Sequence, residues 1–142
     1  MKTKYHMRTT AIRQIPEPNI RTKNGRTARR WTLLVNVSDL PQGMSDAPNP
    51  REPKVNRKLW KEIRSELLND GDAPANIFHV KNKGITLCVD HIHRDRKKNG
   101  CVLTFDSNLR HGLLDGGHTY TIITESQNEI KTRNSNGEDI NQ

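Results

Sequence analysis

The sequence is poor in the residues that build a large hydrophobic core. Hydrophobic residues make up 31% of the chain and aromatic residues 4%, whereas globular domains average roughly 45–50% apolar residues when glycine is counted. The chain has 142 residues, the size of one ordinary domain, so we expect no second independent core. One modest core with polar segments at its ends is the arrangement that this composition favours.

Long apolar runs and cysteine clusters are also missing. No stretch approaches the roughly 18 apolar residues of a membrane-spanning helix, and no apolar run follows the basic N-terminus as in a signal peptide. We therefore expect a soluble, cytoplasmic protein that does not contact membranes. The only cysteines, Cys88 and Cys101, lack CxxC spacing, and we expect them to be reduced and buried.

Positive charge is present, but it is concentrated in one segment. Residues 1–31 contain nine basic residues and one acidic residue, which accounts for the whole net charge of +8. Such a segment can contact phosphates, anionic lipid or an acidic protein surface, and a solvated tail is the alternative. We expect residues 1–29 to form a disordered basic arm. An α+β domain over residues 30–126 would follow, and residues 127–142 would be a polar tail or a truncated continuation.

Hydrophobic periodicity predicts the elements of this domain. Alternating apolar positions indicate strands over residues 30–41, 76–80, 84–93 and 101–105, which we expect to form a mixed sheet. Residues 94–100 form a charged hairpin tip that turns at Asn99-Gly100. The prolines and the glycine of residues 41–53 predict a loop.

A four-residue spacing predicts one main amphipathic helix of about three turns, packed on the sheet. Asn56 is its expected N-cap and Asn69-Asp70-Gly71 its expected end. The apolar stripe consists of Val55, Leu59, Ile63 and Leu67, and Trp60 and Leu68 widen it.

The segment HGLLDGGHTYTIIT, residues 111–124, has two interpretations. Asp-Gly between hydrophobic residues is a strong hairpin signal, and the threonines and isoleucines that follow favour a strand. Alternatively, a strand ends at the two glycines and a helix begins near His118, with free N–H groups that favour a phosphate. Asp115 would then orient a sugar hydroxyl or a metal-bound water, and His118 would donate to phosphate. The residues alone leave both interpretations open.

The histidines offer a metal site as a further alternative. His91 and His93 lie two apart on an expected strand, so their side chains share a face, and His79, His111 and His118 would complete a ligand set. No glutamate falls at a helpful spacing, so we expect exposed sheet histidines and no metal. The chain also has no nucleophile elbow, which argues against acyl hydrolysis.

Two basic patches are candidates for nucleic-acid contact. With two phenylalanines, two tyrosines and two tryptophans, a stacking surface for single strands is poorly supported, and non-specific contact with a duplex backbone is the better expectation. Solvated lysines on a flexible hairpin tip are the alternative. The first patch contains Arg26, Arg29 and Arg30, and the second contains Arg94, Arg96, Lys97 and Lys98.

Three segments resemble the AIPR (abortive infection phage resistance) family. They are NPREPKVNRKLWKEIRSELL, IFHVKNKGITLCVD and LLDGGHTYTII, and the resemblance covers roughly residues 33–125. Family members have a strand that enters Asn-Asn-Gly-Ile and an Asn-Gly-x-Gln-Thr turn. Here Lys83 and Asp115 each replace an asparagine and His118 replaces a glutamine, so the ligand or its charge preference would differ. Family members run longer past this turn, which implies a truncated or minimal member.

The third segment also resembles the Asp-Gly-x-His-Arg phosphate loop of ParB- and sulfiredoxin-like domains, in which a strand turns into a helix over a bound nucleotide. Thr119 stands at the final arginine of that loop, so this side chain cannot clamp a phosphate directly. Together the two resemblances favour the strand–turn–helix interpretation and imply a ligand loop.

The resemblance thus implies a bacterial antiphage defence component that binds a nucleotide or phosphate at the DGGHT turn and nucleic acid through its basic arm. Lys83 would supply the positive charge that Thr119 cannot. Two other classes stay open: a nucleotide hydrolase or metal-dependent nuclease using Asp115 and His118, and a protein-interaction fragment of a larger protein. We expect a nucleotide ligand and no divalent metal. The expected ligand residues are Asn82, Lys83, Gly84, Asp115, Gly116, Gly117, His118 and Thr119.

Overall fold

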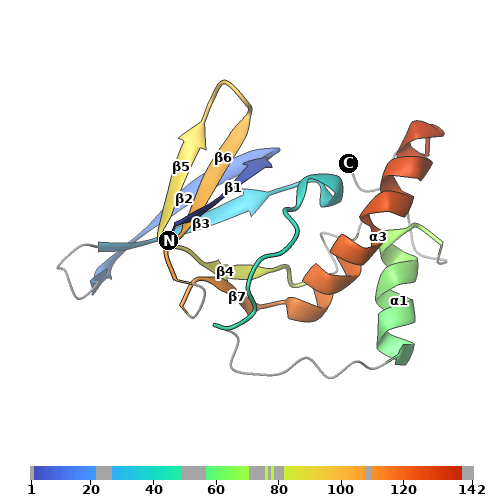
Figure 1. The fold of residues 1–142 in the computed structure, drawn as a ribbon, viewed down its shortest axis with the longest axis horizontal. Helices are drawn as coiled ribbons and strands as arrows, with labels where there is room; N and C mark the ends of the chain where they lie inside the picture. Colours follow the sequence, from blue (N-terminus) through green and yellow to red (C-terminus); the bar gives the residue numbers. More distant parts are fainter. Residues whose placement is uncertain are drawn as a thin grey trace.

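The chain folds as an α+β protein, which confirms the expected class (Figure 1). The computed structural model describes residues 2–21, 27–48, 57–70, 76, 78, 82–107 and 110–138. In chain order the elements are β1 (Thr3–Arg8), β2 (Ala11–Arg21), β3 (Thr27–Leu34), the 3₁₀ turn η1 (Val37–Asp39), α1 (Arg57–Leu67), β4 (Thr86–Cys88), β5 (His91–Asp95), β6 (Gly100–Phe105), β7 (Gly112–Asp115) and α3 (Gly117–Ser135).

The described strands form three small antiparallel sheets instead of one mixed sheet. β6 lies between β1 and β5 in the largest sheet, β2 pairs with β3, and β4 pairs with β7. The strand expected over residues 84–93 is interrupted after Cys88, because its first half pairs with β7 and its second half with β6. The strand expected over residues 30–41 ends at Leu34, and η1 follows. The hairpin tip between β5 and β6 is present as predicted, with Asn99 at φ 51°.

The N-terminal segment differs from the expected free arm. β1 runs antiparallel to β6, with Thr3 opposite Phe105 and Arg8 opposite Gly100, and β2 pairs with β3. Met7 is 5% exposed and belongs to the core. More buried and more exposed residues alternate along β1. This pattern is short and lies among charged residues, so it is not recognised in the sequence. Arg26 lies outside the described residues.

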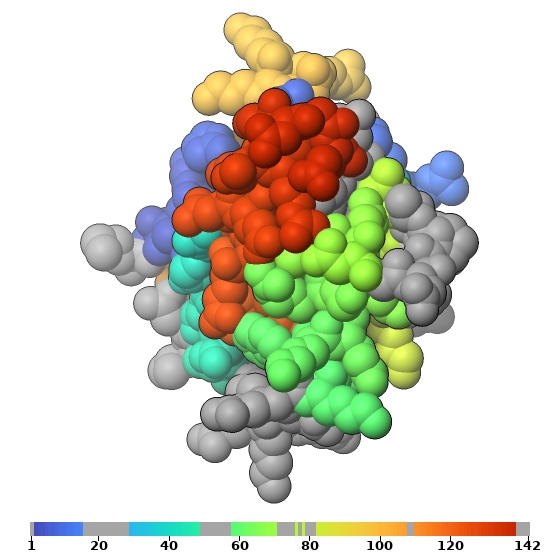
Figure 2. All heavy atoms as spheres, turned by 90° about the vertical axis from the view of Figure 1, so that its right-hand side faces the viewer, coloured from blue at the N-terminus to red at the C-terminus, as the bar shows by residue number. Residues whose placement is uncertain are grey.

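The two helices α1 and α3 pack side by side, away from the three-stranded sheet (Figures 1 and 2). Leu67 and Leu68 of the α1 end are almost fully buried, whereas Leu59 is 48% exposed. The predicted helix is therefore correct, and its buried face consists of the predicted stripe residues Trp60, Ile63, Leu67 and Leu68. It differs from the prediction in the exposure of Leu59 and in packing on α3 rather than on a sheet. The expected cap, Asn56, lies outside the described residues. No helix in the described part of the chain is long and apolar enough to cross a bilayer.

The strand expected over residues 76–80 is wrong at its described positions. Asn76 lies in a turn with φ 61°, and Phe78 has helical conformation. The Asn82 N–H donates to the Phe78 carbonyl at 2.9 Å, which is the i to i−4 bond of a helical turn. Phe78 is 6% exposed and packs into the same cluster as Leu67. The ring therefore closes the core between the two helices.

Helix α3 contributes to two hydrophobic cores. Tyr120 joins the core under the three-stranded sheet, whereas Ile122, Ile123 and Ile130 form the core shared with α1. Buried α3 positions recur every three or four residues as far as Ile130, so one face of the helix is buried along most of its length. α3 crosses the boundary expected at residues 126 and 127. The first core also holds Met7, Met44, Cys101, Leu103, Phe105 and Leu113.

Buried polar groups of α3 hold the segment around η1. The Tyr120 hydroxyl donates to the Pro41 carbonyl at 2.7 Å. The Gln127 amide, 2% exposed, donates to the carbonyls of Val37 and Leu40 at 2.9 and 2.8 Å. Because each buried polar group has a partner, this packing avoids the cost of desolvated, unpaired atoms.

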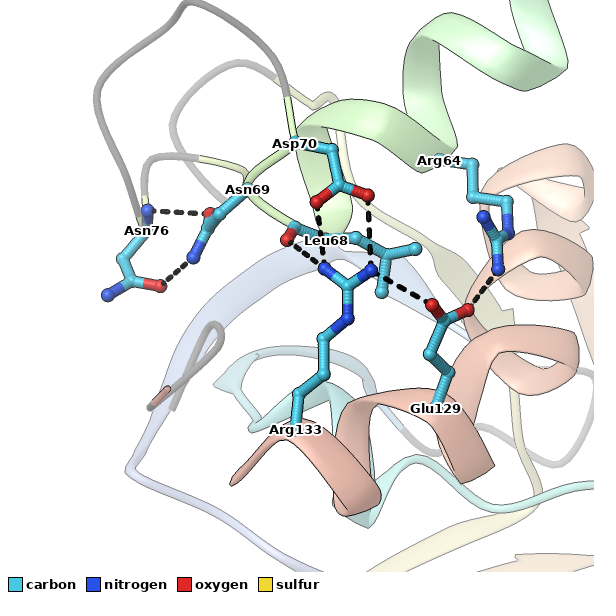
Figure 3. A network of polar contacts seen from close by, with 7 residues as sticks. All are labelled: Arg64, Leu68, Asn69, Asp70, Asn76, Glu129 and Arg133. Atoms are coloured by element: carbon cyan, nitrogen blue, oxygen red, sulfur yellow. Dashed lines mark hydrogen bonds and ion pairs between the residues drawn. The ribbon is translucent and has the colours of Figure 1, made fainter. Parts of the chain in front are cut away.

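Arg133 joins the end of α1 to α3 (Figure 3). Its guanidinium donates to the Leu68 carbonyl at 3.0 Å, to the Asp70 carboxylate at 2.8 and 3.3 Å, and to Glu129 at 2.9 Å. Arg64 of α1 pairs with the other oxygen of Glu129. The hydrogen bond from Arg133 lowers the pKa of Asp70 below its ordinary value.

This lowered pKa makes the helix pair sensitive to acid. The Asp70–Arg133 pair stabilises the fold above the ordinary carboxyl pKa of about 4 and loses this contribution as the pH falls through the lower, folded-state pKa. The Asp70 side chain is 49% exposed, so the contribution is at most about 1 kcal/mol. We expect Asp70→Asn to lose this amount at neutral pH in urea unfolding and to flatten the acid dependence. Asp106→Asn, an exposed carboxylate, is the control; equal behaviour of the two variants would contradict the assignment.

Candidate functional site

The DGGHT turn is a strand-to-helix turn, as predicted. β7 ends at Asp115, Gly116 takes the left-handed conformation with φ 81° and ψ 23°, and α3 begins at Gly117. The hairpin interpretation is therefore wrong. The threonines that favoured a strand are accommodated in the helix because their hydroxyls donate back to carbonyls of the preceding turn. Thr121 donates to Gly117 at 2.9 Å and Thr124 to Tyr120 at 3.0 Å.

Gly116 lies directly against the backbone that leads into β4. A Cβ atom at Gly116 would come within 2.5 Å of the Gly84 carbonyl oxygen and 2.9 Å of the Ile85 Cα. Thr86 pairs with Asp115 in the adjoining ladder. A glycine is thus required at this position both by its positive φ and by the close approach.

Asn82 connects the same backbone to the first turn of α3. Its Nδ2 group donates to the Thr119 hydroxyl at 3.1 Å, and its Oδ1 accepts the Gly84 N–H at 2.8 Å. Thr119 is 7% exposed. The structure therefore brings Asn82, Gly84 and Thr119 together, but Asn82 and Thr119 bond to each other, so their described contacts position the turn.

The other expected ligand residues surround this arrangement. Lys83 and Asp115 are exposed, and His118 is half-buried. The Asp115 carboxylate accepts the Gly116 N–H at 2.9 Å. The turn therefore presents one cationic side chain, one carboxylate and one imidazole near the start of α3.

The first N–H groups of α3 are donors without an acceptor in the described part of the chain. The Tyr120 N–H donates to the Gly116 carbonyl at 2.9 Å. For the N–H groups of Gly117, His118 and Thr119, no acceptor is found among the described residues. Gly117 and Thr119 are buried, and such N–H groups at the positive end of a helix favour an anion or an ordered water.

The described residues of the two predicted basic patches lie on different elements. Arg29 and Arg30 are exposed on β3, and as successive strand residues they point to opposite faces. Arg94, Arg96, Lys97 and Lys98 are exposed at the tip between β5 and β6, which projects beyond α3 in Figure 2. Sequence analysis missed Arg8, which pairs with Gly100 beside this tip; only the alternation within β1 would have revealed it.

The described histidines do not converge on a metal site. His91 and His93 are exposed on β5, and His79 lies outside the described residues. The His111 Nδ1 accepts the backbone N–H groups of Asp106 and Ser107 at 2.9 and 3.1 Å, so this ring serves the loop before β7. Among the described residues no three His, Cys, Asp or Glu side chains form a metal-binding group.

Comparison with known proteins gives one family match. A protein-family model described as AIPR protein matches residues 47–138, more than half of the 142 residues. The match starts later than the resemblance noted in the sequence and extends past the end of α3. It includes α1, β4 to β7 and α3, and leaves β1 to β3 outside. No match was found among curated proteins or solved structures.

Two glycines allow the contact at the turn to be tested. Gly84 and Gly116 have nearly equal φ values, 84° and 81°, but a Cβ at Gly84 meets nothing within 4 Å. Alanine at Gly84 should cost only the left-handed strain, about 1–2 kcal/mol. Alanine at Gly116 should cost about 1 kcal/mol or more beyond that, because the backbone must also move. Chemical denaturation measures both variants; equal losses would show that the close approach does not matter.

Proposed function

The chain belongs to the AIPR protein family, and on this premise we propose that it is a phosphate- or nucleotide-binding component of abortive-infection defence, acting in the cytoplasm. The antiphage context follows from the family. The ligand class is our own inference from the turn between β7 and α3. A resemblance of this turn to the phosphate loop of ParB-like domains supports the same ligand class.

One observation carries the proposal: the N–H groups of Gly117, His118 and Thr119 at the start of α3 have no acceptor within the described part of the chain. Buried backbone donors are almost always paired in folded proteins. A phosphate oxygen satisfies several of them at once, and the helix dipole favours its negative charge. Gly117 has no side chain that could cover these N–H groups.

The charged side chains at the turn determine which ligand charge is preferred there. Lys83 is exposed next to Gly84, whose carbonyl oxygen approaches Gly116, so its flexible ammonium group would reach a bound anion. Asp115 carries the opposite charge and would repel a phosphate at short range. We therefore assign Lys83 to the anion and infer that Asp115 lies toward a sugar hydroxyl or solvent.

The basic residues outside the turn support a second contact, with nucleic acid. Arg94, Arg96, Lys97 and Lys98 project from the hairpin tip, and Arg29 and Arg30 are exposed on β3. Contacts of this kind with phosphates are independent of base sequence and weaken with salt. We propose that this contact keeps the protein on nucleic acid while the turn binds its own ligand.

The nucleotide proposal is tested by thermal shift and isothermal titration with ATP, GTP and inorganic phosphate. A ligand that binds only the folded state must raise the Tm. Lys83→Ala should weaken binding about tenfold, because it removes a charge-assisted contact. Asp115→Asn should strengthen binding, because it removes a repulsive carboxylate.

Lys131→Ala is the matched control. Lys131 is exposed on the same helix, but it lies 14 residues from Gly117, about 20 Å along the axis at 1.5 Å per residue. Its loss should leave the affinity unchanged. The proposal fails if none of the three probes raises the Tm, or if Lys83→Ala and Lys131→Ala have the same effect.

A further inference from the structure

An open groove of about 570 Å³ lies at the tip of the three-stranded sheet. Its walls come from three stretches of chain that are distant in sequence: residues 8–12, Asn36 with Asp39, and the hairpin tip from Arg94 to Gly100. In Figure 1 this tip and the β4–β7 pair that leads into the DGGHT turn point to different ends of the molecule. The groove is therefore separate from the turn.

The packing of β1 against β6 builds one side of the groove. Gly100 pairs with Arg8 on one side and with Asp95 on the other. A Cβ at Gly100 would come within 2.1 Å of the Met7 carbonyl oxygen, so only glycine permits this approach. The Thr9 N–H donates to the Asn99 carbonyl at 3.0 Å. Arg8 is thus held beside the hairpin tip by backbone contacts.

The charged side chains of the groove are not neutralised by one another. Three arginines and two aspartates line it, yet none of the five forms an ion pair within the described part of the chain. Arg94 donates to the Ile12 carbonyl at 3.2 Å, and Asp95 accepts the Lys98 N–H at 3.3 Å. The side chains of Arg94 and Asp95 therefore stabilise the fold. For the side chains of Arg8, Arg96 and Asp39, no hydrogen bond or ion pair is found among the residues that the structure describes.

We propose that this groove binds the sugar–phosphate backbone of duplex DNA. Guanidinium groups match phosphate oxygens in charge and geometry, and the threonines and asparagines of the walls add the neutral donors that contact phosphate and sugar. An open groove suits a polymer that passes through it. Residues 8–12 of the groove wall belong to the segment that carries the excess positive charge of the chain, and such an excess attracts a polyanion.

This inference rests on the proposed nucleic-acid contact and names its site. It also assigns opposite roles to two kinds of residue in the same walls. Arg8 and Arg96 hold phosphates, whereas the carboxylate of Asp39 opposes them. Removing the arginines and removing the carboxylate must therefore change affinity in opposite directions, a result that loss of folding cannot produce.

The experiment measures binding of the full chain to a short fluorescent DNA duplex by anisotropy at several salt concentrations. Arg8→Gln and Arg96→Gln should each weaken binding about tenfold. Each should also reduce the slope of log K against log salt by about 0.9, the value for one phosphate contact. Asp39→Asn should strengthen binding. Arg110→Gln, an exposed arginine beyond the opposite end of β6, is the control and should change neither quantity.

The outcomes separate the two proposals. If the unaltered protein does not bind the duplex, both the nucleic-acid contact and the groove are wrong. If it binds, but the Arg8 and Arg96 variants behave as the Arg110 control does, the groove is wrong and the contact lies elsewhere. If AMP binds as tightly as the duplex with the same dependence on Arg8, the groove takes a free phosphate ester and the polymer proposal is overturned. The Tm of each variant verifies that it is folded.

Discussion

The rest of the structure depends on the contact between Gly116 and the backbone at Gly84 and Ile85. A Cβ at Gly116 would come within 2.5 Å of the Gly84 oxygen, so β7 can end and α3 can begin beside β4 only with glycine at this position. α3 is the helix that both hydrophobic cores share. Its start therefore fixes how the sheet layer and the helix pair are joined, and its Gln127 and Tyr120 side chains then hold the segment around η1.

The same contact clarifies what the glycine-rich motif says about function. Gly116 and the pair Asn82–Thr119 are explained by packing and hydrogen bonding alone, so they would be needed without any ligand. A ligand is favoured by groups that have no partner among the described residues, the first N–H groups of α3, and by the exposed Lys83. By the same reasoning, Arg8 and Arg96 are the unused groups of the groove at the hairpin tip.

Elements whose signals are local were predictable from the sequence. The residues Asn99-Gly100 predict the hairpin tip through their turn preference, and the apolar spacing predicts the helix that ends at Leu67. The interpretation of residues 115–119 needed a family resemblance, because Asp-Gly followed by threonines satisfies a hairpin equally well. Features that depend on distant partners were not predictable. In β1, the charged residues obscure the alternation of buried and exposed positions. Phe78 is helical because it fills the core between α1 and α3. The groove is formed by three stretches that are distant in sequence.

The central claim is that the start of α3 binds an anion through the first backbone N–H groups of the helix, directly after the glycine turn. Titration of the ¹⁵N-labelled protein with ATP, followed by NMR, tests it residue by residue. The account predicts saturable shifts centred on the amides of Gly117, His118 and Thr119, since bound oxygens would accept from these N–H groups. Shifts confined to the hairpin tip, or no saturable shift at these three amides, would contradict it.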